Sequence, residues 1–322
     1  DPGPIVGDSV KTTALPCSLE PGRISREIDF ATISAGDSTG CGISTAGRAY
    51  CWGLGREGEL GNGLPGDASK PGIVSSTVTF ASVSVGGSHA CGIATSGIAY
   101  CWAAISSDSS VMRDSSTALR RFLSRLATVQ WCSRVFSAGF RHTCGVTASG
   151  DGYCWGDNTY GQVGDGTSGA GDFADLPTLV AGGLSFASIS AGGDHTCGIT
   201  TGGAAYCWGD NTVGQLGNGG VGGASAVPTP VAGAPAFTRI SASTGTRAVL
   251  PPPALPLPYK QFGRGHTCAL TSAGAVWCWG DDTDLQLGRG QFTGGSGLSG
   301  VAQQVSNGEK AGSKLATSIS VG

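Results

Sequence analysis

The chain has 322 residues and a formal net charge of −3, and it combines 57 glycines with only 13% charged residues. No apolar run approaches the ~20 residues of a membrane-spanning helix, the charge is too low and too balanced for a disordered tail, and no basic excess indicates nucleic-acid binding. Because each glycine costs a helix about 1 kcal/mol relative to alanine, the composition also disfavours long helices.

One pattern recurs five times, with a period of about 50 residues. Each unit opens with a strand-like stretch that ends in glycine, such as FATISAG at 30–36 or FASISAG at 186–192. Two cysteines ten residues apart follow, with a tryptophan directly after the second. A run of the form W-G-D-N-x-x-G-Q-x-G comes next, at 155–164 and 208–217. Short strands and turn residues repeated at this period predict the blades of a β-propeller.

The sequence therefore predicts a single all-β domain over 1–322, a propeller of four-stranded blades with partial blades at both ends. In chain order, we expect the tail of a preceding blade and an irregular segment at 1–29, complete blades at 30–79, 80–132, 133–185, 186–236 and 237–316, and the start of a further blade at 317–322.

The two ends of the chain repeat parts of the blade pattern. PGPIVG at 2–7 is similar to the closing stretch PTPVAG at 228–233, and ATSISVG at 316–322 is similar to the opening stretch at 80–86. Either these ends share one closing blade, or the five blades are a fragment of a six- or seven-bladed ring. We favour the fragment, although an open ring would expose sheet edges.

Two stretches break the repeat. Residues 103–132 contain no glycine, yet the spacing from Cys91 to Cys144 stays at 53. A reading-frame slip in the gene sequence explains replaced composition at constant length, whereas Leu119, Phe122, Leu123 and Leu126 lie at the spacing of a real helix. Residues 243–262 form a proline-rich insertion, which predicts an extended loop, a retained intron or a ligand for a proline-recognising domain.

The paired cysteines lie in predicted β-hairpins. In CGISTAGRAYC, at 41–51, a three-residue loop at 45–47 with Gly47 in the left-handed region makes a common hairpin. That register puts the two cysteines opposite each other, with Cα atoms about 4.5–5.5 Å apart, a separation that a disulfide accepts. The same spacing predicts Cys41–Cys51, Cys91–Cys101, Cys144–Cys154, Cys197–Cys207 and Cys268–Cys278.

Period-two alternation places Cys41, Ile43, Ala49 and Cys51 on one apolar face, suited to packing between blades. Free buried thiols or a metal site are the alternatives to disulfides, although zinc favours a C-x2-4-C spacing. Disulfides would indicate an oxidising compartment and hence an extracellular or cell-surface protein, whereas free thiols would indicate an intracellular one. Cys17 and Cys132 are left without a partner.

The unit G-x-x-H-T-C-G-I-T-x-x-G-x-x-Y-C-W-G-D-N-x-x-G-Q-L-G-N-G, clearest at 192–219, resembles the regulator of chromosome condensation repeat. The resemblance covers residues 30–102, 137–242 and 263–290. It implies a propeller, seven-bladed in many members, and the cysteine-rich version looks like secreted or cell-surface members. The family includes a nuclear exchange factor for a small GTPase, plant ultraviolet-sensing proteins and a secreted β-lactamase inhibitor, so the fold does not choose a function.

Several recurring polar and aromatic positions are candidate sites. The four histidines each stand two residues before a first cysteine, and blade symmetry would hold them too far apart to share one metal ion, so we expect structural hydrogen bonds: His89, His142, His195 and His266. The Asp-Asn pairs at 157–158 and 210–211 suit calcium by donor type, but without a D-x-D-x-D-G loop they predict turns that bond their own backbone. The recurring tryptophans predict packing rather than a light-sensing cluster: Trp52, Trp155, Trp208 and Trp279.

No catalytic pattern is present: no G-x-S-x-G elbow lies at a strand-to-helix turn, and the sequence has no phosphate-binding G-x-x-x-x-G-K-[ST] loop. We therefore expect a non-enzymatic protein-binding scaffold, without cofactor or metal, that is secreted or surface-attached and binds an unidentified protein. The alternatives are an intracellular regulator resembling the GTPase exchange factor, and an inhibitor of a secreted enzyme such as a β-lactamase. The candidate binding residues lie in two blade loops: Asp157, Asn158, Tyr160, Gln162, Asp210, Asn211, Gln215 and Asn218.

Overall fold

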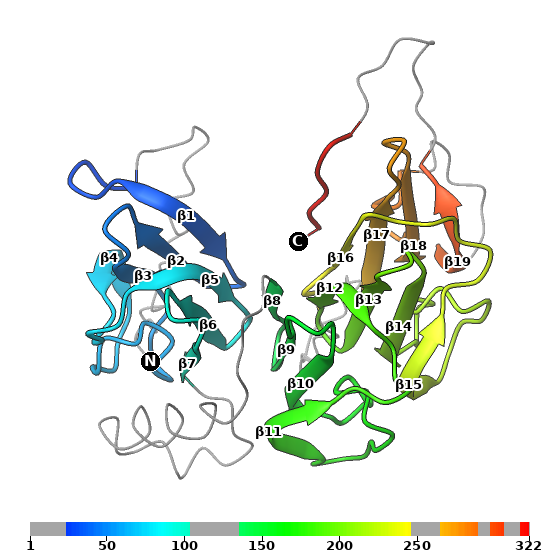
Figure 1. Cartoon of the computed structure of the whole chain (residues 1–322), viewed down its shortest axis with the longest axis horizontal. Helices are drawn as coiled ribbons and strands as arrows, with labels where there is room; N and C mark the ends of the chain where they lie inside the picture. Colours follow the sequence, from blue (N-terminus) through cyan, green and yellow to red (C-terminus); the bar gives the residue numbers. More distant parts are fainter. Residues whose placement is uncertain (1–23, 104–134, 246–264, 289–296, 306–315, 322) are drawn as a thin grey trace, which may run out of the picture.

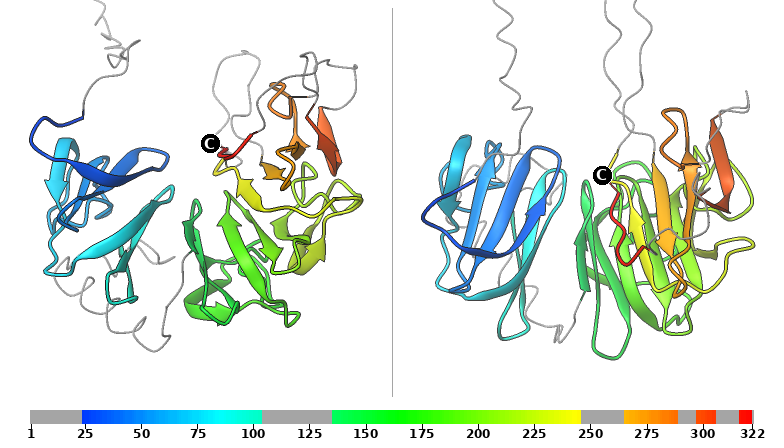
Figure 2. Two further views of the ribbon diagram at one scale, coloured as in Figure 1. Left: turned by 45° about the horizontal axis from the view of Figure 1, so that its top comes forward. Right: turned by 90° about the horizontal axis from the view of Figure 1, so that it is seen from above.

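A computed structural model describes residues 24–103, 135–245, 265–288, 297–305 and 316–321, and this part of the chain contains strands and no helix. The strands form five antiparallel sheets, here called blades 1 to 5, which follow one another along an arc (Figures 1 and 2). The prediction of an all-β propeller is therefore confirmed.

Four blades have four strands each, and in each of them neighbours in the sheet are neighbours in sequence. Blade 2 has three strands in the described part, because the fourth strand expected before residue 132 falls among residues 104–134, which lie outside it. The strands are, in blade 1, β1 (Phe30–Ala35), β2 (Thr39–Ser44), β3 (Ala49–Gly53) and β4 (Ala68–Ile73); in blade 2, β5 (Phe80–Val85), β6 (His89–Ala94) and β7 (Ala99–Ala103); in blade 3, β8 (Val135–Ala138), β9 (His142–Val146), β10 (Gly152–Asp157) and β11 (Phe173–Leu179); in blade 4, β12 (Phe186–Ala191), β13 (His195–Thr200), β14 (Ala205–Asp210) and β15 (Ala224–Pro230); and in blade 5, β16 (Arg239–Ala242), β17 (His266–Leu270), β18 (Val276–Asp281) and β19 (Leu298–Gln304).

The hairpin between the second and third strands has the predicted register. Cys41 pairs with Cys51 and Ile43 with Ala49, and Gly47 has a φ of 76°, which glycine adopts without steric cost. In each of the five pairs the sulfur atoms lie at bonding distance, with Cα–Cα distances of 4.0 to 4.1 Å. These are somewhat shorter than the expected separation.

The core lies between blades rather than within them. The buried tryptophan of one blade packs against the cysteine hairpin of the blade before it: Trp102 joins the cluster of Cys41 and Cys51, and Trp208 joins that of Cys144 and Cys154. This arrangement explains why small residues and disulfides recur on one face of each hairpin, since they leave room for an indole ring.

A serine on the first strand ties each blade to the next. The Ser34 hydroxyl accepts a hydrogen bond from the Val85 main-chain N–H at 3.0 Å, and the same contact recurs from blade to blade at Ser84, Ser137 and Ser190. Ser241 of blade 5 accepts from the N–H of Val321 at 3.1 Å. Residues 316–321 therefore stand, relative to blade 5, where each first strand stands relative to the blade before it.

Within the described residues, no blade covers the face at the opposite end of the arc. Ile33 on β1 is 53% exposed, whereas Ile189, at the same place on β12, is 3% exposed because blade 3 packs on it. The uncovered face is the one that a preceding blade would bury.

The proline-rich insertion separates two paired strands. Ser241 pairs with Cys268 and Ala242 with Thr267, although more than 20 residues separate them in sequence. Most of this insertion, the glycine-free stretch beyond Ala103, Cys17 and Cys132 lie outside the described residues.

Candidate binding face

The predicted binding loops lie at one end of the blades. In an antiparallel meander, the turn between the first and second strands and the loop between the third and fourth share that end. Hydrogen bonds join them: Asp157 N–H donates to the Arg141 carbonyl at 3.0 Å, and Asp210 N–H donates to the Asp194 carbonyl at 2.8 Å. We call this end of blades 3 to 5 the loop face.

The first residue of each loop forms an Asx turn. One carboxylate oxygen of Asp157 accepts from the Thr159 N–H at 2.8 Å, and Asp210 accepts from the Thr212 N–H at 3.1 Å. Asp281 repeats the contact in blade 5. The prediction that these residues bond their own backbone is therefore confirmed.

The second residue of each loop holds the loop closed from inside. Asn158 is buried, accepts from the Val163 N–H at 3.0 Å and donates to the Thr167 carbonyl at 3.0 Å. Asn211 does the same towards Leu216 and Gly220. An asparagine side chain supplies both an acceptor and two donors, so a single residue satisfies both sides of the loop.

The glutamine of each loop joins it to the next blade. The Gln162 side chain accepts from the Tyr160 N–H at 2.8 Å, while its main-chain carbonyl accepts from the Trp208 indole N–H at 2.9 Å. Gln215 makes the same two contacts with Val213 and Trp279. The position of the loop is thus fixed by two blades.

The predicted binding residues consequently fall into two groups. Five are buried and hold the loops in shape: Asn158, Gln162, Asp210, Asn211 and Gln215. The other three reach the surface: Asp157 is half-buried, Tyr160 is 38% exposed, and Asn218 is exposed. Only the second group can touch a partner directly, and the first group would act through the shape of the loop.

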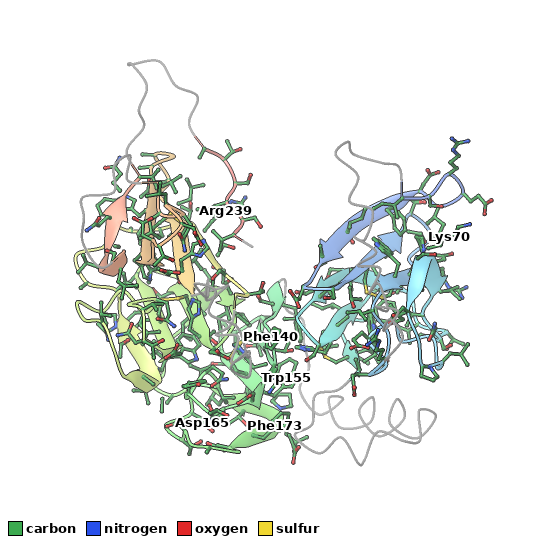
Figure 3. The ribbon with its side chains drawn as sticks, turned by 180° about the vertical axis from the view of Figure 1, so that it is seen from behind. Lys70, Phe140, Trp155, Asp165, Phe173 and Arg239 are labelled. Atoms are coloured by element: carbon green, nitrogen blue, oxygen red, sulfur yellow. A yellow bond between two sulfur atoms is a disulfide. The ribbon has the colours of Figure 1, made fainter. Side chains whose placement is uncertain are left out.

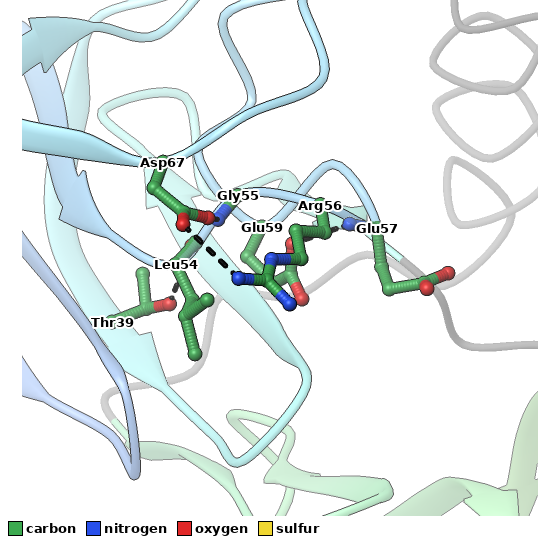
Figure 4. Close-up of polar contacts among 7 residues, drawn as sticks. All are labelled: Thr39, Leu54, Gly55, Arg56, Glu57, Glu59 and Asp67. Atoms are coloured by element: carbon green, nitrogen blue, oxygen red, sulfur yellow. Dashed lines mark hydrogen bonds and ion pairs between the residues drawn. The ribbon is translucent and has the colours of Figure 1, made fainter. Parts of the chain in front are cut away.

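Blade 1 builds the corresponding loop from different residues (Figure 4). Glu59 stands where the other blades have glutamine, and it accepts from the Glu57 N–H at 2.8 Å while its carbonyl accepts from the Trp102 indole at 3.0 Å. Arg56 pairs with Asp67 at 3.5 Å on the exposed side. Such an exposed pair contributes at most about 1 kcal/mol.

The described part of the loop face carries mostly acidic side chains. The described residues of blades 3 to 5 contain ten aspartates and two arginines, and of these Arg141 alone is a cation on the loop face. Figure 3 shows Asp165 in blade 3 and Arg239 in blade 5, far apart. Eight of the aspartates lie in the turns and loops of this face: Asp157, Asp165, Asp172, Asp194, Asp210, Asp281, Asp282 and Asp284.

Asp194 was not among the predicted binding residues, yet it lies at the centre of this charge. Burial and the carboxylates of Asp210 and Asp157 raise its pKa from 3.8 to about 6, and Arg141 opposes part of this shift. The sequence signal was its place directly before His195, a position that varies from blade to blade. The carboxylates of Asp157 and Asp210, which act on it, belong to two different loops. The repeat pattern alone does not show that these loops lie near Asp194.

Three of the four histidines form the predicted structural hydrogen bonds, and in each case the bond joins two blades. Nε2 of His89, His142 and His195 lies 2.6, 2.8 and 2.9 Å from a threonine hydroxyl of the next blade. Within the described residues, no group of three or more His, Cys, Asp or Glu side chains is arranged to hold a metal ion. The part of the chain that the structure describes also has no helix that could cross a membrane.

Comparison with solved structures agrees with the propeller. Yeast (Saccharomyces cerevisiae) Prp20p superposes with a TM-score of 0.65 at 19% identity, over 87% of this chain and 64% of that one. Human WBSCR16 superposes with a TM-score of 0.69 at 17% identity, over 88% of this chain and 68% of that one. At these identities the structural similarity supports a shared fold and nothing further.

Among curated proteins, the chain is 36% identical over 83 residues to a human protein described as the probable E3 ubiquitin-protein ligase HERC4, which is 25% of this chain and 8% of the relative. It is 27% identical over 175 residues to human HERC3, a probable ligase of the same kind, which is 54% of this chain and 15% of the relative. The chain thus matches only a small part of these relatives.

The regulator of chromosome condensation (RCC1) repeat matches the chain over residues 30–59, 135–162, 186–215 and 261–286 in one form, and over 46–93, 149–199 and 202–250 in another. Together these matches cover well over half of the chain and contain four of the five cysteine hairpins in full, together with Cys91 of the remaining one. The protein belongs to the RCC1 repeat family.

Proposed function

We propose that this protein is a non-enzymatic scaffold whose loop face binds a basic surface of a partner protein. The observation that carries the proposal is the segregation of charge: eight aspartates and a single arginine occupy the loop face in the described part of blades 3 to 5. A concentrated negative field attracts a positive partner and accelerates encounter.

The internal bonding of the loops supports this role. Asn158 and Asn211 close their loops from inside, and Gln162 and Gln215 fix them to the next blade. A face already held in its bound shape loses little conformational entropy on association. The loops can therefore present exposed groups in fixed positions.

Apolar groups stand among the charges. Tyr160 and Leu285 are 38% and 56% exposed on loops of blades 3 and 5. Tyrosine is enriched in protein interfaces because it combines a large contact area with a polar hydroxyl. We assign direct contact to Tyr160, Asp194 and Asp284, with the buried loop residues acting through loop shape.

The five cysteine pairs favour an oxidising compartment. We therefore propose an extracellular or cell-surface location, and an intracellular regulator is the alternative that free thiols would favour. Prp20p binds Gsp1p and histones. Because its identity to this chain is low, the structural similarity supports a shared fold and not a shared partner. The partner proposed here is defined by charge and not by that likeness.

Affinity capture from the extracellular fluid of the native source tests the proposal. Immobilised wild-type protein is compared with the variant D194N/D284N/Y160A and with a control, D151N/D175N, which removes the same charge away from the loop face. We expect the wild type and the control to retain one basic protein, with retention falling as salt rises, and the variant to lose it. Equal retention by all three proteins would overturn the assignment of the loop face.

A further inference from the structure

Three histidines bridge successive blades in the same way. His89 on β6 reaches Thr143 on β9, His142 on β9 reaches Thr196 on β13, and His195 on β13 reaches Thr267 on β17. All three imidazoles are buried. Each bridge lies beside a disulfide hairpin, because the same threonine hydroxyl is 3.7 to 3.8 Å from a cysteine sulfur of the histidine's blade.

The hydrogen bonds of two threonines show which imidazole nitrogen carries a proton in two of the bridges. The Thr196 hydroxyl donates to the Gln162 carbonyl at 2.8 Å, and the Thr267 hydroxyl donates to the Gln215 carbonyl at 3.2 Å. A threonine has one hydroxyl proton, so each hydroxyl must accept from the imidazole. Nε2 of His142 and of His195 therefore carries a proton, and in the neutral imidazole this leaves a bare lone pair on Nδ1.

The other nitrogen faces no hydrogen-bonding group. Nδ1 of His89, His142 and His195 is buried and unpartnered within the described residues. A glycine packs over each ring: a Cβ added to Gly86, Gly139 or Gly192 would lie 2.7 to 2.9 Å from the Cε1 atom. A proton added to Nδ1 would thus create a buried charge and a donor without an acceptor.

We propose that these three bridges form an acid-sensitive latch between blades 2 to 5. At neutral pH the uncharged imidazoles join the blades. Protonation of Nδ1 places an uncompensated charge in each interface, and the blades separate. Since the loops of blades 3 and 4 are fixed to the next blade, separation also dismantles that part of the loop face.

The electrostatic surroundings agree with this proposal. Burial lowers the pKa of His89 to about 4. Burial, together with the facing imidazoles of His195 and His89, lowers the pKa of His142 to about 3. Burial and the facing His266 lower the pKa of His195 to about 3. Other imidazoles, which repel added charge, act on His142 and His195 from the packed strands. In the chain, Arg141 directly precedes His142 and Asp194 directly precedes His195.

The sign of the pH effect follows from these values. A histidine whose pKa is lower in the folded state than its unfolded value of 6.5 binds protons more tightly when unfolded. Stability is therefore full above pH 6.5 and falls as the pH drops towards 4. At pH 5, each latch histidine reduces the folding equilibrium constant about 30-fold, and three independent ones reduce it about 3 × 10⁴-fold.

The test compares acid transitions followed by tryptophan fluorescence, because Trp155, Trp208 and Trp279 are buried between blades. The variant H89Q/H142Q/H195Q keeps a side-chain N–H donor but cannot be protonated. We expect its transition midpoint to lie at least about one pH unit below that of the wild type. H266Q is the control, because His266 is only half-buried at the end of the described blades. An unchanged midpoint in a folded triple variant would overturn the latch.

A measurement on the wild type covers the case in which the triple variant does not fold. Nitrogen NMR of the imidazoles should show neutral rings with the proton on Nε2, and no titration of His142 or His195 above pH 4 while the protein is folded. Titration of these rings near pH 6.5 in the intact fold would overturn the proposal.

Discussion

Trp208 donates its indole N–H to the main-chain carbonyl of Gln162, 2.9 Å away in the loop of the preceding blade. The Thr196 hydroxyl donates to the same carbonyl at 2.8 Å, so both of its lone pairs are used. Through this one oxygen, the loop of blade 3, the packing tryptophan of blade 4 and the histidine bridge between the two blades form a continuous unit.

The close approach of loop and tryptophan requires glycine at position 164. Gly164 has a φ of 80°, and an added Cβ would lie 2.5 Å from the Trp208 Nε1 atom. We expect Gly164→Ala to lower the free energy of unfolding by about 3 kcal/mol or more, from backbone strain and overpacking together. Gly166→Ala is the matched control, because its φ of 98° is also strained but the nearest atom is 3.9 Å away. Its cost should be only about 1–2 kcal/mol, as measured by denaturant unfolding, and equal losses would contradict the packing argument.

Asp194 should oppose folding at neutral pH. Its folded pKa of about 6 exceeds the ordinary 3.8, so the folded state disfavours the charged form, and the cost is present above pH 6 and absent below pH 4. We expect Asp194→Asn to stabilise the protein by about 1–2 kcal/mol at pH 7.5, after allowance for partial exposure.

The pH dependence of that gain is the check. Thermal unfolding of Asp194→Asn and of the exposed control Asp175→Asn should differ at pH 7.5, and the difference should vanish near pH 4. This trend is opposite in sign to that of the histidine latch. A gain that did not depend on pH would mean that neither the burial of the Asp194 charge nor the nearby carboxylates of Asp210 and Asp157 are its cause.

Residues 316–321 are proposed to be the first strand of a further blade. The amide of Val321 bonds to Ser241 just as the amide of Ala242 bonds to Ser190. We expect Ser241→Ala to increase the hydrogen-exchange rate of the Val321 amide and to leave that of Ala242 unchanged, while Ser190→Ala should affect Ala242. If Val321 exchanges at the rate of an unstructured peptide in the wild type, this segment does not occupy the strand position.

Local features of the fold could be predicted from the sequence. The hairpin register follows from the spacing of Cys41, Gly47 and Cys51, because a three-residue loop with a left-handed glycine leaves one way to pair the strands. The burial of Ile43 and Ala49 then follows from alternation. Both arguments use contacts within about ten residues of sequence.

Contacts between blades could not be predicted in the same way. His142 and Thr196 are 54 residues apart, and no local rule states which residue of the next blade a histidine reaches. The loop residues illustrate the same limit. Asn158 and Tyr160 are both polar loop residues in the sequence, but only the packing shows that the first points inward and the second outward.

The claim on which both the fold's core and the proposed compartment depend is that the ten paired cysteines are oxidised. Intact mass after thiol alkylation, with and without prior reduction, tests it directly on protein from the native source. The account predicts that these ten cysteines become alkylated only after reduction, as expected for five buried hairpin bridges. Alkylation of all 12 cysteines in the unreduced, denatured protein would contradict it and would favour an intracellular regulator.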